Sequence, residues 1–160
     1  MNEESSDNAG DANPAGIGNS AFIGTWRLLS FEALTSDMRT LYPYGSHPKG
    51  LLIYDGHGNM AVQLLRAERQ RFSTDDKSQG SVQEIRGAFT SYEAYFGTYE
   101  IDEHEGTVTH RLEAALFPNW SGSEQKRYFE FSGPRLTLRT PSIPYGGTML
   151  VSTLVWERTG

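Results

Sequence analysis

The sequence lacks cysteine entirely, has no long hydrophobic run and carries no excess of positive charge. Without cysteine the chain forms no disulfide, offers no thiolate nucleophile and builds no cysteine-ligated zinc site. No apolar run approaches the roughly 20 residues that cross a membrane as a helix. The formal net charge is −6, whereas a nucleic-acid surface is basic and clustered. We therefore expect neither a membrane span nor a nucleic-acid partner.

Other familiar site motifs are missing as well. The histidines are scattered along the chain, and no two have the spacing of metal ligands. Gly56 and Gly58 belong to a turn that is followed by neither the helix nor the lysine of a phosphate-binding loop. No nucleophile motif supports a Ser-His-Asp arrangement. We expect no metal and no cofactor.

The first residues differ in composition from the rest of the chain. Residues 1–20 are polar, small and acidic, and such a segment cannot bury enough apolar surface to offset its ordering entropy. Met1 and the residues after it lack the basic flank and apolar stretch of a secretory signal. We expect a disordered tail over 1–20, a single domain over 21–160 and a location in the cytoplasm.

From residue 24 onward, short segments of strand-forming residues alternate with Gly, Pro, Asp and Asn. This spacing is typical of antiparallel all-β proteins. The pattern predicts eight strands, at about 24–33, 50–54, 59–66, 97–102, 107–117, 124–131, 135–140 and 148–158.

One helix interrupts the predicted strands. Ser81 and Glu84 have the spacing of a capping box, in which the two side chains satisfy the first helical turn. Apolar residues then recur at spacings of three and four, which gives one apolar face, and Gly97 is placed to end the helix. The pattern predicts a helix over 81–96 whose apolar face consists of Val82, Ile85, Phe89, Tyr92 and Phe96.

The connections between the predicted strands are of two kinds. Three are tight turns, at 55–58, 103–106 and 132–134. The others are longer and carry aromatic residues, and the connection at 67–96 carries the predicted helix. In an up-and-down meander alternate connections lie at the same end, so the tight turns gather at one end and the long loops at the other. We expect a plain floor and a mouth with a helical lid, where binding residues lie on the loops.

The two-residue period of strands assigns side chains to the barrel interior. In the hairpin 50–66 the expected inward residues are Leu51, Ile53, Met60, Val62 and Leu64. In the strand 107–117 they are Val108, His110, Leu112, Ala114 and Leu116.

A few polar residues share these inward faces. Pairing across the turn at 103–106 places His110 opposite Tyr99, and the alternation of the next strand turns Gln125 and Arg127 inward. The predicted interior is therefore apolar near the floor, with polar groups higher up. This is the composition of a small-molecule pocket.

Several motifs resemble a known family. Gly24-Thr25-Trp26 on the first strand and Arg158 on the last resemble the lipocalin, or calycin, pattern. Gly50 to Asp55, Tyr95 to Tyr99, Leu116 to Trp120 and Ser152 to Arg158 resemble the bacterial and fungal lipocalin-like domain family, and the resemblance covers about 24–158.

The resemblance implies an eight-stranded antiparallel up-and-down barrel, and the predicted helix lies between its third and fourth strands, where secreted lipocalins have no such long helix. It also implies that Trp26 and Arg158 form a structural floor. Related barrels bind hydrophobic small molecules, and some in natural-product pathways are cyclases or isomerases. The absence of a signal peptide and of disulfides distinguishes this chain from secreted lipocalins.

Two functions remain open on the sequence: binding of a small, largely hydrophobic molecule, or cofactor-independent cyclase or isomerase activity in the same cavity. In the enzyme, His110, Tyr99 and Arg127 would handle protons or developing charge, whereas in a purely structural role His110 would be held by Tyr99. A non-binding interaction module would instead have a filled interior. The sequence specifies neither the ligand nor the oligomeric state. Expected ligand contacts are Gln125, Asn119, Trp120, Tyr92, Phe96 and Tyr145.

Overall fold

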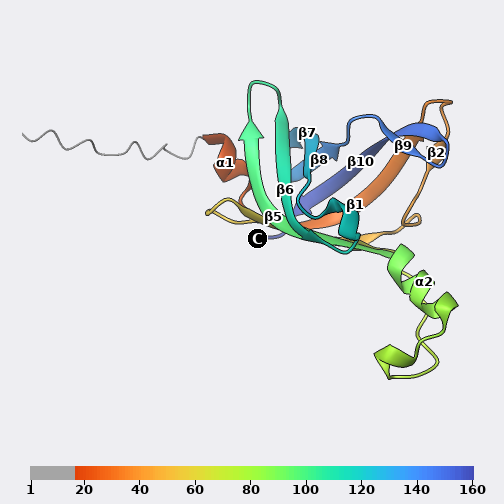
Figure 1. Ribbon diagram of the computed structural model, residues 1–160. Coiled ribbons are helices and arrows are strands. Elements are labelled where there is room, and N and C mark those ends of the chain that lie inside the picture. Colours follow the sequence, from red (N-terminus) through yellow and green to blue (C-terminus); the bar gives the residue numbers. More distant parts are fainter. Residues whose placement is uncertain (1–16) are drawn as a thin grey trace, which may run out of the picture.

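Antiparallel strands close into a barrel in the computed structural model, which describes residues 17–160 (Figure 1). The barrel strands are β1 (Gly24–Thr35), β3 (Lys49–Tyr54), β4 (Asn59–Leu65), β5 (Tyr92–Asp102), β6 (Thr107–Ala115), β7 (Glu124–Ser132), β8 (Arg135–Arg139) and β10 (Thr148–Arg158). The remaining elements are the short strands β2 (Thr40–Leu41) and β9 (Ile143–Tyr145), the helices α1 (Ile17–Phe22) and α2 (Val82–Thr90), and the single turns η1 (Lys77–Gln79) and η2 (Pro118–Trp120).

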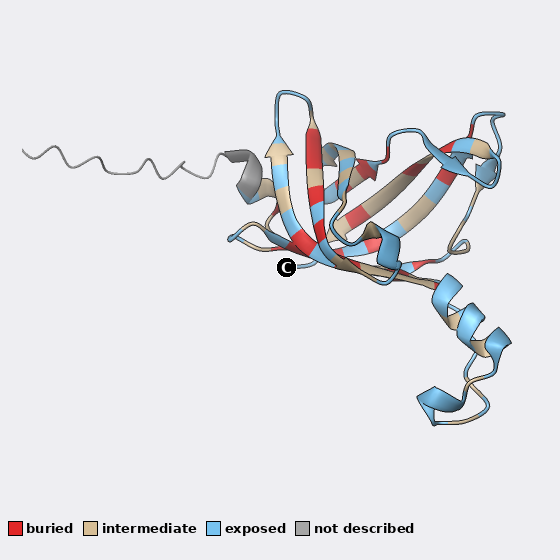
Figure 2. Ribbon diagram, viewed as in Figure 1, coloured by how far each residue is buried: buried red, intermediate tan, exposed pale blue. Residues whose placement is uncertain are grey.

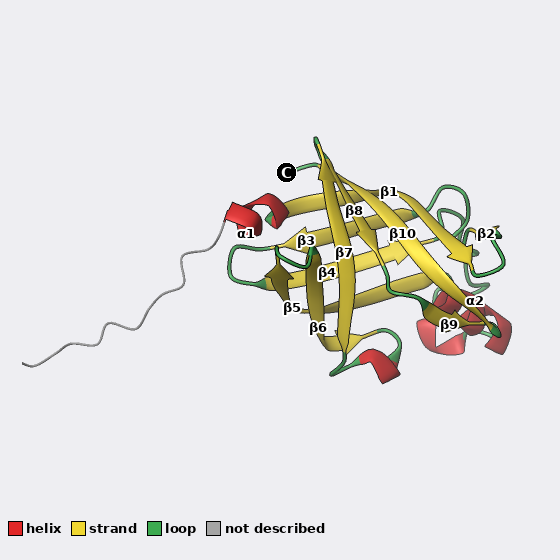
Figure 3. Ribbon diagram, turned by 90° about the horizontal axis from the view of Figure 1, so that it is seen from above, coloured by secondary structure: helices red, strands yellow, loops and turns green. Residues whose placement is uncertain are grey.

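Barrel strands that follow one another in the sequence are also neighbours in the sheet. The order is β1-β3-β4-β5-β6-β7-β8-β10, and pairing of β1 with β10 closes the sheet. The closing register sets Trp26 opposite Arg158 and Thr35 opposite Leu150. Closure matters because it removes the unpaired strand edges that an open sheet would expose. Figure 3 shows the strands wrapped around a common interior. The predicted eight-stranded up-and-down barrel is confirmed.

Aromatic side chains fill the end of the barrel that carries α1. Phe22 is fully buried, and its ring meets those of Tyr54, Phe129 and Phe131 edge-on, at centroid distances of 4.9 to 5.4 Å. The Trp26 indole N–H donates to the Phe22 carbonyl at 2.9 Å. Each buried aromatic ring removes a large apolar area from water. This end is therefore a solid floor.

The N-terminal helix lies partly within the expected tail. Residues 1–16 of that tail lie outside the described part of the chain, and α1 begins at Ile17. Within residues 17–160, no helix is long and apolar enough to cross a membrane.

The second helix begins as predicted but is shorter. The Ser81 hydroxyl accepts from the Glu84 N–H at 3.1 Å, and the Glu84 carboxylate accepts from the Ser81 N–H at 2.8 Å, so the capping box is confirmed. However, α2 ends at Thr90, and the next residues form the start of β5. The prediction of a helix to residue 96 is wrong because Tyr92 to Thr98 pair along the whole of β4. Strand pairing satisfies the same backbone groups and also extends the closed sheet.

The same helix does not cover the mouth. Figures 1 and 2 show α2 projecting away from the barrel with an exposed surface. Val82 is 85% exposed, and Ile85 and Phe89 of the expected apolar face are also exposed. The expected lid is therefore absent from the described structure.

Two of the predicted inward faces need correction. In β3 the buried residues are Leu52 and Tyr54, while Ile53 is 39% exposed, so the face is shifted by one residue. In β6 a bulge lies opposite Phe96 and Gly97, so Leu112 pairs with Gly97 but Ala114 pairs with Phe96. The bulge inserts one residue and changes the face beyond it.

The residues beyond the bulge show that reversal of faces. Ala115 packs against the core, whereas Leu116, expected to face inward, follows the end of β6 and is exposed. Gly97 does not end a helix but lies at the bulge, where a β-carbon would be 1.9 Å from the Arg111 carbonyl oxygen.

Candidate ligand-binding cavity

A cavity of about 510 Å³ lies inside the barrel, toward the end opposite the Phe22 floor. Its deeper wall is apolar and includes Leu52, Val62, Leu138 and Trp156. The volume lies within the range of roughly 300–1,000 Å³ typical of small-molecule sites. An interior with this much open space distinguishes the protein from a barrel packed solid.

Aromatic residues from the long loops and neighbouring strands surround the mouth. Tyr44 stacks on Phe31 at 5.3 Å between ring centroids, and Trp120 meets Tyr95 edge-on at 6.4 Å. Tyr145 of β9 lines the same opening. Burial raises the pKa of the Tyr44 hydroxyl to about 12, so it stays protonated at neutral pH. The mouth therefore offers neutral aromatic surfaces to a molecule that enters.

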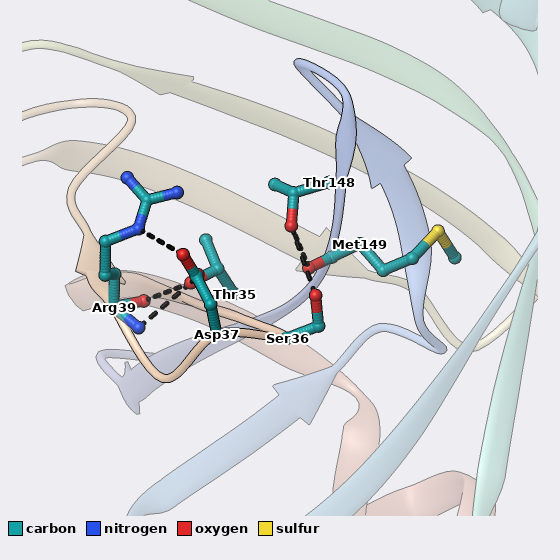
Figure 4. Close-up of polar contacts among 6 residues, drawn as sticks. All are labelled: Thr35, Ser36, Asp37, Arg39, Thr148 and Met149. Carbon is teal, nitrogen blue, oxygen red and sulfur yellow. Dashed lines mark hydrogen bonds and ion pairs between the residues drawn. The ribbon is translucent and has the colours of Figure 1, made fainter.

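Hydrogen bonds hold the segments beside β9 in place (Figure 4). Ser36, which follows β1, donates its N–H to the Met149 carbonyl at 2.9 Å, and its hydroxyl lies 3.2 Å from that of Thr148. Thr35 and Asp37 close the adjacent turn, where the Thr35 hydroxyl oxygen accepts from the Arg39 N–H at 2.9 Å. Since Thr148 and Met149 pair with β9, these bonds fix one side of the mouth.

The polar part of the cavity is built around His110. Its Nε2 lies 2.6 Å from the Tyr54 hydroxyl, and its Nδ1 lies 3.1 Å from the Tyr95 hydroxyl. Burial lowers the pKa of His110 from 6.5 to about 3, and the positive charge of Arg127 adds to this effect. His110 is therefore neutral at physiological pH, with both ring nitrogens engaged.

Tyr99 is paired with His110 in the sheet, as predicted from the turn. Its hydroxyl, however, donates to the Asp55 carbonyl at 2.8 Å and does not reach the imidazole. The two tyrosines that contact His110 are Tyr54 and Tyr95, and neither is among the residues expected from the sequence.

A specific signal would have identified Tyr54. The Asp55 N–H donates to the Asn59 carbonyl at 3.0 Å, so the turn residues are 56–58 and Tyr54 pairs with Met60. If the turn is taken as the three residues 56–58, which end in glycine, Tyr54 lies opposite Met60 and on the same face as Met60 and Val62. The predicted helix includes Tyr95, and only the pairing of Tyr95 with Val62 of β4 shows that its side chain faces inward.

Arg127 is half-buried and lines the cavity, as its strand position predicts. Its guanidinium donates to the Gln125 side-chain oxygen at 2.6 Å and to the Lys126 carbonyl at 3.0 Å. Among residues 17–160, no carboxylate forms an ion pair with it. The guanidinium therefore contributes an uncompensated positive charge to one wall.

The other expected contacts divide into two groups. Gln125, Trp120 and Tyr145 line the cavity together with His110 and Arg127. Asn119, Tyr92 and Phe96 do not line it. Asn119 is exposed on η2, the Tyr92 hydroxyl bonds the side chain of Gln63, and Phe96 is 49% exposed. In β5 the inward positions belong instead to Glu93 and Tyr95.

Glu93 and Trp156 are among the wall residues that the sequence does not predict. Glu93 lines the cavity, and burial raises the pKa of its carboxyl group. Trp156 is 1% exposed, and its indole N–H has no hydrogen-bond partner among the described residues. An unpaired buried donor is uncommon in folded proteins.

The comparisons with known proteins agree with this geometry. A model of the lipocalin-like domain family matches residues 23–159. The chain is also 26% identical over 106 residues to the 4'-hydroxy-3'-methoxypropiophenone carrier protein ppsC of Aspergillus oryzae, an alignment that covers 62% of this chain and 96% of the relative. Since the family match covers every strand of the barrel, this protein belongs to the lipocalin-like domain family.

Proposed function

We propose that the protein binds a small, largely apolar molecule that carries a carbonyl group, and that aryl ketones of natural-product metabolism are the ligand class. The observation that carries this proposal is the cavity of about 510 Å³, whose deeper wall is apolar and whose polar groups include His110, Gln125 and Arg127. Apolar walls supply binding energy, and a few fixed polar groups supply orientation.

The similar fungal protein supports the choice of ligand class. Its name describes a carrier of 4'-hydroxy-3'-methoxypropiophenone, which is an aryl ketone. The aromatic residues Tyr44, Trp120 and Tyr145 around the mouth offer surfaces on which an aryl ring packs. We use this ketone as the probe ligand below and call it the aryl ketone.

Leu154→Trp provides the direct test, because Leu154 lines the cavity and a larger side chain would occupy it. We expect wild-type protein to bind the aryl ketone at one site per chain, and Leu154→Trp to bind it at least about tenfold more weakly because the space is filled. Binding is measured by isothermal titration calorimetry.

Thr153→Trp is the matched control, since Thr153 precedes Leu154 on β10 and its side chain points to the opposite face. It should bind the ketone as the wild type does. Wild-type protein without saturable binding would overturn the proposal, as would equal affinities of the two tryptophan variants.

Cofactor-independent isomerase or cyclase activity is the second candidate, because Tyr95, His110 and Arg127 all line one cavity. The engagement of both His110 nitrogens favours binding over proton abstraction. Prolonged incubation followed by chromatography and NMR separates the two functions. A carrier returns the aryl ketone unchanged, whereas an enzyme acting on such ketones returns an isomer or a cyclised product.

A further inference from the structure

Three buried side chains from three strands form one chain of hydrogen bonds. Tyr54 of β3 contacts Nε2 of His110 on β6, and Nδ1 of the same imidazole contacts Tyr95 of β5. Tyr95 and His110 line the cavity, whereas Tyr54 lies behind them against the floor. These hydrogen bonds therefore connect the solid floor of the barrel with the cavity at the other end.

The direction of these bonds follows from counting hydrogens. A neutral imidazole donates from one nitrogen and accepts at the other. Among residues 17–160 the Tyr54 hydroxyl has no partner except His110. If Tyr54 accepted the bond, its own hydrogen would be buried without an acceptor, which is unfavourable. We therefore assign Tyr54 as the donor to Nε2, which leaves the hydrogen of His110 on Nδ1.

The distances agree with this assignment. The contact of 2.6 Å at Nε2 is short, as expected when a hydroxyl donates, and the contact of 3.1 Å at Nδ1 fits an N–H donor. In this arrangement the Tyr95 oxygen accepts from His110, and the hydroxyl hydrogen of Tyr95 has no acceptor among the described residues.

The surroundings of Tyr95 favour an oxygen acceptor with partial negative charge. Burial raises the pKa of the Tyr95 hydroxyl, so it keeps its hydrogen, and the nearby Arg127 opposes this rise. The same guanidinium contributes positive charge to the wall and has no ion-pair partner in the described chain. A carbonyl oxygen placed here would accept from a fixed hydroxyl beside a positive charge.

We propose that the Tyr95 hydroxyl is the specificity-determining donor of the cavity, that it bonds the carbonyl oxygen of the ligand, and that Tyr54 and His110 are positioning residues that keep it available as a donor. This inference rests on the proposed binding function. It shifts ligand recognition from His110, whose nitrogens are both engaged, to the tyrosine that His110 orients.

Tyr95→Phe tests the donor with two ligands, the aryl ketone and the same phenol with a propyl group in place of its propionyl group. We expect Tyr95→Phe to weaken ketone binding about tenfold and to leave binding of the propyl analogue unchanged. Tyr99→Phe is the matched control, because its hydroxyl bonds the Asp55 carbonyl and lies outside the cavity lining. It should change neither affinity.

The ring-nitrogen NMR shifts of His110 test the positioning role. We expect them to show a hydrogen on Nδ1 and none on Nε2 in the wild type, and to change in Tyr54→Phe. A hydrogen on Nε2 would overturn the assigned direction and with it the inference.

The outcomes separate this inference from the function on which it rests. Wild-type protein that binds neither ligand overturns both. Wild-type protein that binds the ketone while Tyr95→Phe binds it equally well, or loses both ligands to the same extent, overturns the inference alone.

Discussion

The His110 side chain is uncharged inside the folded barrel at neutral pH. Only 1% of its surface is exposed, and burial, followed by the charge of Arg127, lowers its pKa from 6.5 to about 3. Between these two values the unfolded chain binds a proton at this residue and the folded chain does not. Acid in this interval therefore favours the unfolded state.

We predict that the free energy of unfolding falls as the pH decreases from 6.5 toward about 4.5, by up to about 1.4 kcal/mol per pH unit from His110. Hydrogen bonds from Thr35 and Asn59 lower the pKa of the Asp37 and Asp55 carboxyl groups, so these groups contribute little in this window. Urea denaturation at several pH values measures the slope.

His110→Gln is the comparison for that slope, since glutamine keeps hydrogen-bonding capacity but does not titrate. It should show a smaller decrease in stability with acid. The difference between the two proteins isolates His110 from other groups such as Glu93, whose pKa is raised. Parallel slopes would mean that His110 is already protonated in the folded protein or does not titrate differently on unfolding.

The bulge between β5 and β6 requires glycine at position 97. A β-carbon there would lie 1.9 Å from the Arg111 carbonyl oxygen, which belongs to the backbone of the paired strand. We predict that Gly97→Ala destabilises the protein by about 2–4 kcal/mol, because the two strands must separate locally. The change is measured by thermal and chemical denaturation.

Gly87→Ala is the control, because it makes the same glycine-to-alanine change in another secondary-structure element. Gly87 lies inside α2 and nothing lies within 4 Å of its added β-carbon. Alanine favours a helix over glycine by roughly 0.5–1 kcal/mol. This variant should be as stable as the wild type or more so, and a similar loss in both variants would contradict the steric explanation.

The strands themselves were predictable because their signals are local. Alternation of side chains and the glycine-containing turns at 55–58, 103–106 and 132–134 determine where strands begin and end. The eight barrel strands agree with the prediction within a few residues except at the start of β5, whereas the short strands β2 and β9 are not predicted. There, the spacing of four between Tyr92 and Phe96 fits one face of a helix and also one face of a strand. Pairing with β4, a contact distant in sequence, decides between the two.

The errors in the candidate site follow from errors in these elements. The sequence does not identify Tyr95, because its spacing predicts a helix, or Tyr54, because the predicted inward face of its strand is the opposite one. His110, Gln125 and Arg127 were placed correctly inside the cavity because they lie on strands whose pairing follows from nearby turns. A shift of one residue in a strand exchanges its two faces. An error of one residue in a predicted turn therefore places an inward side chain on the outer face and leaves it out of the predicted site.

In the molecule as a whole, the contacts that close the floor lie at one end of the barrel and the cavity lies toward the other end. At the floor, the Arg158 guanidinium lies over the Trp26 ring at 4.3 Å, and it donates to the backbone carbonyls of Ile23 and Ala21. These contacts attach the end of α1 and the residue that follows it to the last strand, and so support closure of the barrel. Neither Trp26 nor Arg158 lines the cavity.

We predict that Arg158→Met lowers the free energy of unfolding by about 2–4 kcal/mol, because it removes charged hydrogen bonds and a cation–π contact while keeping an apolar side chain. Its dissociation constant for the aryl ketone should equal that of the wild type at temperatures where both are folded. Arg135→Met is the matched control, since Arg135 is an exposed arginine paired with Glu157 beside Arg158, and it should change stability by less than about 0.5 kcal/mol. If a folded Arg158→Met protein lost ligand binding, the floor would contribute to the site; if it were as stable as Arg135→Met, the contacts around Trp26 would not stabilise the closed barrel.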